Sequence, residues 1–429
     1  MSDTTGGGVD GAGLLDGILA ATAAEGRGFL GPAPAPVRPG ASSSPEAQAI
    51  AELDRRIRLF LERILRHPRF VAMRARWSGL HRLASDVPPG GAQTIAVACA
   101  TKRELVQELQ RAPSLDATLC WKAMVDEGLD PDHPRPFGAL LIDATWGAEA
   151  EDLDSLQLLG GIGSVAHCPI LTNAAPNLLG QESWTTLPSE RELARRMDGP
   201  SHARWRSFRQ SEESRFVALA LPSVRLAEAD PTRSWTDHSI GAAWLLAESI
   251  AAGFERDGWG VPPPNWRAAG LDGRGSDSAG PLAIRIADPG LLAGMGLTAA
   301  VPLPGAAGTV ALPERPTAHV AKRFDREAAT QRAAARIQLD HVLASGRFAQ
   351  AMTVIGHRLR RGGASPETVR KSLDNWVARY REGPDAPLLE ARVDLQPGQP
   401  RSGPVLIAWL APRVGGGAAS PDGIALDIL

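Results

Sequence analysis

At 429 residues the chain is long enough for two or three subdomains, and its net charge of −2 excludes the basic surface typical of nucleic-acid-binding proteins. Its three cysteines, Cys99, Cys120 and Cys168, lie far apart without paired spacing, which argues against a disulfide framework and a zinc site. No apolar run approaches the roughly 20 residues that cross a bilayer, so we expect a cytoplasmic protein without membrane insertion.

The first 45 residues predict a disordered tail that carries one short helix. This helix, at about residues 13–24, has four apolar side chains on one side, Leu14, Leu15, Ile18 and Leu19. From Gly26 to Pro45 the chain is rich in Gly, Pro, Ala and Ser, which is typical of an extended linker. The apolar side of the helix needs a partner, which is either its own domain or another protein.

A long amphipathic helix is predicted from Ser44-Pro45, a cap followed by a first-turn proline, to His67-Pro68. Its apolar positions keep helical spacing: Ile50, Leu53, Ile57, Leu61 and Ile64. Acidic residues are interspersed among its arginines, which favours a solvated face over a phosphate-binding patch.

The central part predicts buried strands separated by helices. Strands are expected at Thr94–Ala100, Phe137–Asp143, Val165–Leu171 and Phe216–Pro222, and helices at Lys102–Arg111, Leu115–Glu127 and around Leu156–Leu159. This order describes a covered sheet and contains no obvious active site.

Three short motifs in this part could suggest chemistry. Prolines at both ends of Asp130–Pro134 indicate a solvated loop rather than a metal site. Gly160–Ser164 follows a predicted helix and lacks a Gly-Lys-Ser/Thr sequence, so it is in the wrong order for a phosphate loop. His167 and Cys168, as neighbours in a predicted strand, would point to opposite faces and could not share a proton. We expect no catalytic residue, cofactor or metal.

Beyond a predicted helix at Ile240–Phe254, residues 261–320 are loop-rich, with weak strand signals at Leu282–Ile286 and Thr298–Leu303. Three helices follow. The first covers Ala328–Leu343, the second carries the stripe from Phe348 to Leu359, and the third begins at Ser365-Pro366.

The chain closes with three apolar strands. Leu389, Ala391, Val393 and Leu395 alternate with charged residues, so one face is buried, whereas Val405–Ala411 is apolar throughout and should be covered on both faces. A last strand spans Ile424–Leu429 and needs a pairing partner, either in this chain or in a neighbour. The apolar positions of these strands are Leu389, Ala391, Val393, Leu406, Ile407, Trp409, Ile424, Leu426 and Ile428.

Four ordered blocks of the central part resemble the large subunit of the type VI secretion contractile sheath, the TssC or VipB family. They are Pro136–Leu140, Ala166–Pro169, Ala175–Trp184 and Trp205–Val217. Weaker similarity includes His67–Phe70 and Pro387–Val393, and it thins over Val261–Arg315.

The resemblance implies an α+β contractile-sheath fold, with mixed sheets flanked by helices and with N- and C-terminal segments that contribute to inter-subunit sheets. It divides the chain into residues 1–45, 46–260, 261–320 and 321–429. It implies a structural protein that pairs with a small sheath subunit (TssB/VipA-like) and with copies of itself around an Hcp inner tube on a baseplate. A ClpV-type AAA+ unfoldase would bind Leu14, Leu15, Ile18 and Leu19, and the three strands above would be the inter-subunit strands.

Two alternatives remain. One is a sheath-like paralogue that binds a partner without polymerising. The other is an α/β enzyme that uses Glu212, Glu213 or His167, although no convergent catalytic spacing supports it.

Overall fold

The computed structural model describes residues 45–88, 90–184, 189–226, 239–275, 289–383, 386–397, 404–414 and 421–428. The chain divides into two compact units, residues 1–63 and 64–429. The predicted helix at residues 13–24 and the predicted strand at Leu282–Ile286 lie outside the described residues.

The described part of the first unit is helix α2 (Pro45–Leu65), whose last two residues belong to the second unit. It confirms the predicted helix between Ser44-Pro45 and His67-Pro68. None of its residues is buried. Glu52 accepts hydrogen bonds from Arg55 and Arg56 at 2.8–2.9 Å, as expected for a solvated charged face.

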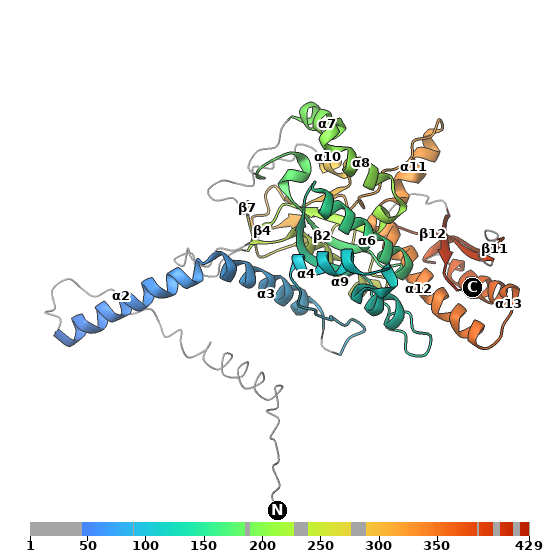
Figure 1. The fold of residues 1–429 in the computed structure, drawn as a ribbon, viewed down its shortest axis with the longest axis horizontal. Helices are drawn as coiled ribbons and strands as arrows, with labels where there is room; N and C mark the ends of the chain where they lie inside the picture. Colours follow the sequence, from blue (N-terminus) through green and yellow to red (C-terminus); the bar gives the residue numbers. More distant parts are fainter. Residues whose placement is uncertain are drawn as a thin grey trace, which may run out of the picture. The chain divides into compact units, whose positions relative to one another are not determined.

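The centre of the second unit is a parallel sheet in the order β1-β2-β3-β8 (Figure 1). Its strands are β1 (Leu140–Trp146), β2 (Ile170–Ala174), β3 (Val217–Leu221) and β8 (Leu297–Ala299). Every residue of β2 and β3 is buried, which is why these segments read as continuous apolar runs.

Alternate residues of the central strands enter two different cores. Ile170 and Leu219 belong to one apolar cluster, whereas Leu171 and Ala218 belong to another, because successive side chains of a strand point to opposite faces. Helix α6 (Ala150–Ala166) covers the first face, and α8 (Ala203–Gln210) packs against α6 in the same core. Helix α9 (Ala242–Asp257) covers the second, and α3 (Pro68–Asp86) packs against α9.

Shorter elements complete this region. The helical ones are α4 (Lys102–Arg111), η1 (Leu115–Ala117), α5 (Leu119–Trp121), η2 (Lys122–Glu127), η3 (Pro176–Leu179), α7 (Glu190–Asp198), η4 (Pro200–His202), η5 (Glu212–Phe216) and α10 (Pro289–Gly294). Two small antiparallel sheets have the orders β6-β10-β9 and β5-β4-β7. Their strands are β4 (Val224–Leu226), β5 (Ser239–Ile240), β6 (Arg267–Ala268), β7 (Leu271–Gly275), β9 (Val301–Pro302) and β10 (Val310–Ala311).

The C-terminal part forms a third core. Helices α11 (Glu327–Arg336), α12 (Leu339–Arg361) and α13 (Pro366–Ala378), with the turn η7 (Arg379–Arg381), precede an antiparallel sheet. Its order is β11 (Leu388–Gln396), β12 (Val405–Pro412) and β13 (Asp422–Leu426). Figure 1 shows α12 and α13 beside this sheet. Apolar residues of the two helices and the strands pack together in one cluster.

Several expectations are wrong in instructive ways. Residues 94–100 contain no strand. Helix α6 continues to Ala166, so β2 begins at Ile170 and not at Val165. Gly160–Ser164 therefore lies inside a helix and does not follow one.

Two glycines that suggested breaks between elements lie inside helices, where close packing excludes a larger residue. A Cβ on Gly160 would lie 2.4 Å from the carbonyl oxygen of Glu213, so α6 needs glycine where it crosses η5. A Cβ on Gly346 would lie 2.5 Å from the carbonyl oxygen of His167. Helix α12 is consequently continuous through this glycine, and the break between the first two C-terminal helices lies at Ile337-Gln338.

Candidate assembly surfaces

His167 and Cys168 lie in a tight turn after α6 and not in the predicted strand. His167 ends α6 with a left-handed backbone (φ 50°), and both residues are buried. Burial lowers the pKa of His167 to about 4 and raises the pKa of the Cys168 thiol to about 12. A neutral imidazole beside a protonated thiol is not an activated nucleophile.

The acidic candidates do not converge either. Glu212 is exposed, with Lys322 at 3.9 Å, while the backbone of Glu213 packs against Gly160. In the Asp130–Pro134 loop, Asp132 forms an ion pair with Arg361 at 2.6 Å. Among the described residues no group of three or more His, Cys, Asp and Glu side chains could hold a metal ion.

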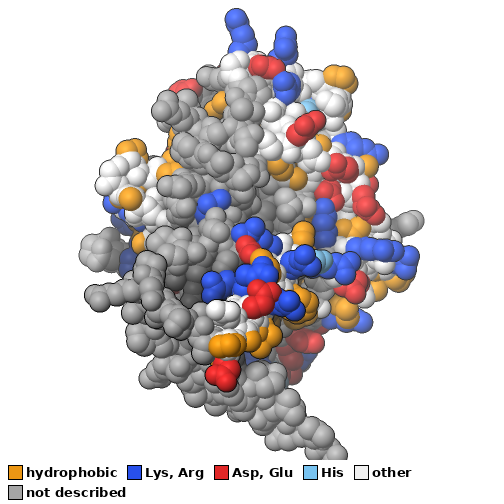
Figure 2. Space-filling view, turned by 90° about the vertical axis from the view of Figure 1, so that its left-hand side faces the viewer, with side chains coloured by type: hydrophobic (Ala, Val, Ile, Leu, Met, Phe, Trp, Pro, Cys, Tyr) orange, Lys and Arg blue, Asp and Glu red, His pale blue; other side chains and the backbone are white. Residues whose placement is uncertain are grey.

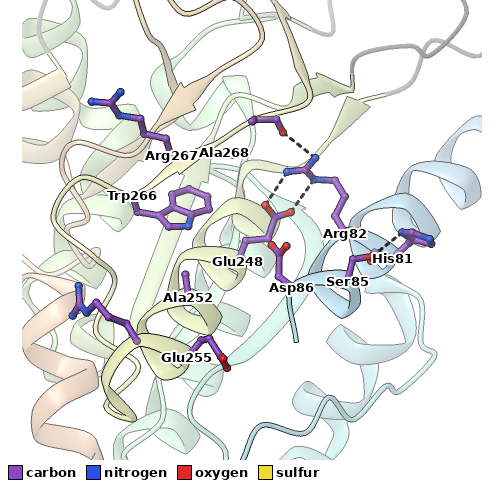
Figure 3. Close-up of a pocket in the computed structure, with 12 residues that line it drawn as sticks. His81, Arg82, Ser85, Asp86, Glu248, Ala252, Glu255, Trp266, Arg267 and Ala268 are labelled. Carbon is purple, nitrogen blue, oxygen red and sulfur yellow. Dashed lines mark hydrogen bonds and ion pairs between the residues drawn. The ribbon is translucent and has the colours of Figure 1, made fainter. Parts of the chain in front are cut away.

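A cavity of about 640 Å³ lies between α3, α9 and the segment that contains β6 (Figure 3). At its wall Arg82 donates to both carboxylate oxygens of Glu248 at 2.9 Å and to the carbonyl oxygen of Ala269 at 3.2 Å. Glu248 is 1% exposed, and burial raises its pKa while Arg82 lowers it. The pair joins α3 to α9 and thereby satisfies a charge that the fold buries.

The same cavity contains a serine close to a histidine. Ser85 Oγ lies 3.3 Å from His81 Nδ1, but its hydroxyl donates to the carbonyl oxygen of His81 at 2.8 Å. The proton therefore points away from the imidazole. Figure 3 shows both side chains on α3 at the border of the cavity, away from Trp266. The arrangement lacks the geometry of a nucleophile held by its base.

A buried charged cluster lies where the C-terminal sheet meets the central core. The Asp422 carboxylate at the start of β13 accepts a hydrogen bond from Arg215, and Arg336 and His341 lie 3.8 Å from its oxygens. Arg336 also donates to the carbonyl oxygen of Pro421. Burial lowers the pKa of His341 to about 3, so its imidazole is neutral at pH 7. The cluster therefore fastens β13 to η5 and α11.

The predicted strand residues take defined places in the C-terminal sheet. Ala391, Val393, Leu406, Leu426 and Ile428 are buried against α12 and α13, and Ile424 is partly buried there. Ile407 and Trp409 lie on the other face, which shows that β12 is not covered on both faces. Instead the guanidinium of Arg392 lies 5.2 Å from the Trp409 ring.

Leu389 does not belong to the buried face. A register shift between Leu388 and Glu390 places Leu388 in the core and leaves Leu389 37% exposed. The alternating pattern identified the strand correctly, but a bulge cannot be read from alternation.

A second apolar surface lies on α2. Seven large apolar side chains of this helix are 42–64% exposed: Ile50, Leu53, Ile57, Leu59, Phe60, Leu61 and Ile64. Their helical spacing explains why the sequence predicted this helix. In Figure 2 basic, acidic and hydrophobic side chains are intermixed on the face that is shown, without a large patch of one charge.

Sequence reasoning missed the Asp422 cluster, because Arg215 and Asp422 are 207 residues apart and neither belongs to a motif. Leu14, Leu15, Ile18 and Leu19 lie outside the described residues. No helix within the described ranges is long and apolar enough to span a membrane.

Two comparisons with known proteins give consistent results. Residues 47–261 match the VipB family, described as EvpB/VC_A0108, tail sheath N-terminal domain. The chain is also 28% identical over 229 residues to the type VI secretion system sheath protein TssC1 of Pseudomonas aeruginosa. This similarity covers 49% of the chain and 46% of that protein, so the chain spans about half the length of the curated relative it matches.

Proposed function

The chain belongs to the VipB family of tail sheath proteins, and we propose that it is the large subunit of a type VI secretion contractile sheath. In this role it pairs with a small sheath subunit of the TssB/VipA type and polymerises around a tube of Hcp-type rings. Shortening of the sheath on its baseplate drives the tube outward. The protein acts in the cytoplasm as a structural and mechanical element and not as an enzyme.

The observation that carries the proposal is the family match over residues 47–261. The C-terminal sheet supports it, because β13 is an outer strand to which another chain could add. Main-chain hydrogen bonds across such a junction contribute on the order of 1 kcal/mol each, without depending on one side-chain geometry. That property suits a lattice whose subunits move while they stay connected.

Contraction in this proposal needs no nucleotide. The extended lattice stores free energy, and a downhill change in subunit packing releases it. ATP hydrolysis belongs to a ClpV-type unfoldase that captures Leu14, Leu15, Ile18 and Leu19. Replacing Leu15 and Ile18 by Asp should abolish capture by the N-terminal domain of the unfoldase, whereas Leu53→Asp in α2 should not. Unchanged capture of the double variant would refute this assignment.

A sheath-like paralogue that does not polymerise is the second candidate. The partial coverage of TssC1 and the divergent segment Val261–Arg315 favour it. Co-expression with a small sheath subunit, followed by negative-stain microscopy, separates the two functions. Tubes with cogwheel cross-sections support the sheath subunit, and a soluble heterodimer supports the paralogue. A monomer that does not bind the small subunit contradicts both candidate functions.

A further inference from the structure

The cavity between α3, α9 and the segment with β6 has the composition of a binding site for an organic cation. Its volume of about 640 Å³ falls within the range of small-ligand pockets. Two further carboxylates line it beside Glu248. They are Asp86, the last residue of α3, and Glu255, which lies about two helical turns after Glu248 on α9. Figure 3 shows the indole ring of Trp266 across from Asp86 and Glu248.

The arginines of the cavity are engaged elsewhere. Arg82 is held in the ion pair with Glu248, at a nitrogen–oxygen distance of 2.9 Å. Arg256 donates through Nε to Asp257 Oδ2 at 3.0 Å. Figure 3 shows the guanidinium of Arg267 directed away from Glu248. The positive charge of the lining is thus either paired or turned outward.

The carboxylates of Asp86 and Glu255, by contrast, have no cation beside them. Both residues are exposed, and no cationic side chain within the described ranges forms an ion pair with either. Burial raises the pKa of Glu248, Arg82 lowers it, and the charge of Asp86 raises it again. One guanidinium therefore serves two neighbouring carboxylates, Glu248 and Asp86, and a second cation would remove the remaining repulsion.

The apolar part of the cavity selects the kind of cation. The three carboxylates do not form a group that could hold a metal ion. Trp266 offers an aromatic ring, and the small side chain of Ala252 lies between the two glutamates of α9. A cation on an aliphatic stem uses both the acidic and the apolar groups. A planar guanidinium also stacks on an indole and donates two parallel hydrogen bonds to a carboxylate, so the cavity suits arginine better than lysine.

We propose that this cavity binds the guanidinium group of an arginine side chain carried by another protein chain, with Trp266 stacked on the guanidinium and Asp86 and Glu255 accepting its N–H groups. A polypeptide is the source because the carboxylate of free arginine would find no partner where Arg82, Arg256 and Arg267 are paired or turned away. The inference concerns the single chain and does not rest on the proposed sheath function.

Titration of the full chain with N-acetyl-arginine methylamide tests the proposal through the indole N–H signals of its 11 tryptophans in nuclear magnetic resonance spectra. The Trp266 signal, identified by its absence from Trp266→Phe, should shift with a Kd on the order of 1 mM, as for one side chain outside its protein. N-acetyl-citrulline methylamide, which has the same shape without the charge, should bind at least about fivefold more weakly.

Several outcomes of this titration would overturn the proposal. An unchanged Trp266 signal would show that the cavity takes up no guanidinium, and equal binding of the citrulline compound would show that charge is not recognised. Equal or tighter binding of the lysine analogue would refute the choice of arginine. Agmatine, a free alkylguanidinium, would refute the polypeptide source if it bound about tenfold more tightly than the arginine compound.

A pair of double variants gives a second readout. Asp86→Asn with Glu255→Gln should weaken binding by about fivefold or more, because both acceptors of the guanidinium lose their charge. The matched control, Glu127→Gln with Asp198→Asn, removes the same charge at exposed positions outside the cavity and should bind like the unmodified chain. Tryptophan signals from the cores report whether each variant is folded. Equal weakening in both pairs would mean that only net charge matters and would overturn the proposal. Since no polymer is needed, the result does not depend on tube formation.

Discussion

At the residue scale, Asp422 is the side chain that connects β13 to elements far away in the sequence. Its carboxylate is 9% exposed and faces two guanidinium groups, Arg215 and Arg336, which approach from different elements. Charges inside a protein are costly unless they are paired. Removing the carboxylate would leave two like charges close to each other at the border of two cores.

We therefore expect Asp422→Asn to lower the free energy of unfolding by about 3 kcal/mol, as for other broken buried pairs. The matched control is Asp394→Asn in β11, whose ion pair with Arg392 is largely exposed and whose loss should cost less than about 1 kcal/mol. Urea unfolding of both variants measures the difference. Equal losses would show that Asp422 does not anchor β13.

His167 gives a pH dependence whose sign follows from burial. In the unfolded chain a histidine titrates near its ordinary pKa of about 6.5, whereas burial lowers the pKa of His167 to about 4 in the fold. Between these values the unfolded state binds more protons. The contribution of the neutral His167 side chain to the free energy of unfolding is therefore complete above pH 6.5. As the pH falls toward 4, this contribution decreases by about 1.4 kcal/mol per pH unit.

His167→Asn isolates this contribution, because Asn accepts the left-handed conformation but does not titrate. Between pH 7 and pH 5 the unmodified chain should lose about 2 kcal/mol more stability than the variant, a difference obtained from urea unfolding at the two pH values. His341 is present in both proteins, so its titration cancels. Parallel pH profiles would contradict a buried neutral His167.

At the element scale, two adjacent glycines of α6 have opposite roles. A Cβ on Gly160 would meet a backbone carbonyl at 2.4 Å, whereas one on Gly161 would meet side-chain atoms, the nearest being the end of Leu115 at 3.3 Å. A backbone atom cannot move aside easily, but the end of a leucine can. Gly160 is thus required by the close packing of α6 against η5, whereas Gly161 is not required and only lowers the stability of the helix.

Gly160→Ala should consequently destabilise the protein by about 1–3 kcal/mol through overpacking. Gly161→Ala should be neutral or stabilise it by up to about 1 kcal/mol, because alanine favours a helix. Thermal unfolding of the two single variants makes the comparison. Similar shifts in both would mean that α6 and η5 do not cross as closely as described.

The elements that the sequence predicted well are those that follow from a local pattern, either the spacing of apolar residues or the composition of a short segment. Helices α2, α4, α9 and α13 follow from apolar spacing and caps, and β3 follows from a buried apolar run that ends at proline. The mixed helix and sheet class follows from the same patterns. Residues 94–100 show the opposite case, since an apolar run without a pairing neighbour does not become a strand.

The surface features that could not be predicted depend on tertiary contacts. The Asp422 cluster joins residues 207 positions apart, and the outer edge of β11 is closed because Asp374 of α13 accepts a hydrogen bond from the Val393 amide. Neither leaves a local signal. The apolar strands themselves were predicted, but only the hydrogen bonds of their outer edges show that the edge of β11 is closed.

At the scale of the whole molecule, two surfaces suit the chain to assembly. One is the exposed apolar stripe of α2, and the other is the outer edge of β13, which a buried cluster connects to the central core. In the proposed sheath a subunit carries force and needs such a connection, because an added strand transmits tension only as far as its neighbour is held.

Cryo-electron microscopy of the polymer formed with a small sheath subunit tests the central claim most directly, at a resolution that separates strands. The account predicts a fourth strand in the C-terminal sheet, contributed by another subunit and paired to β13. A polymer in which this sheet ends at β13, or a chain that stays a self-sufficient monomer beside the small subunit, would contradict it.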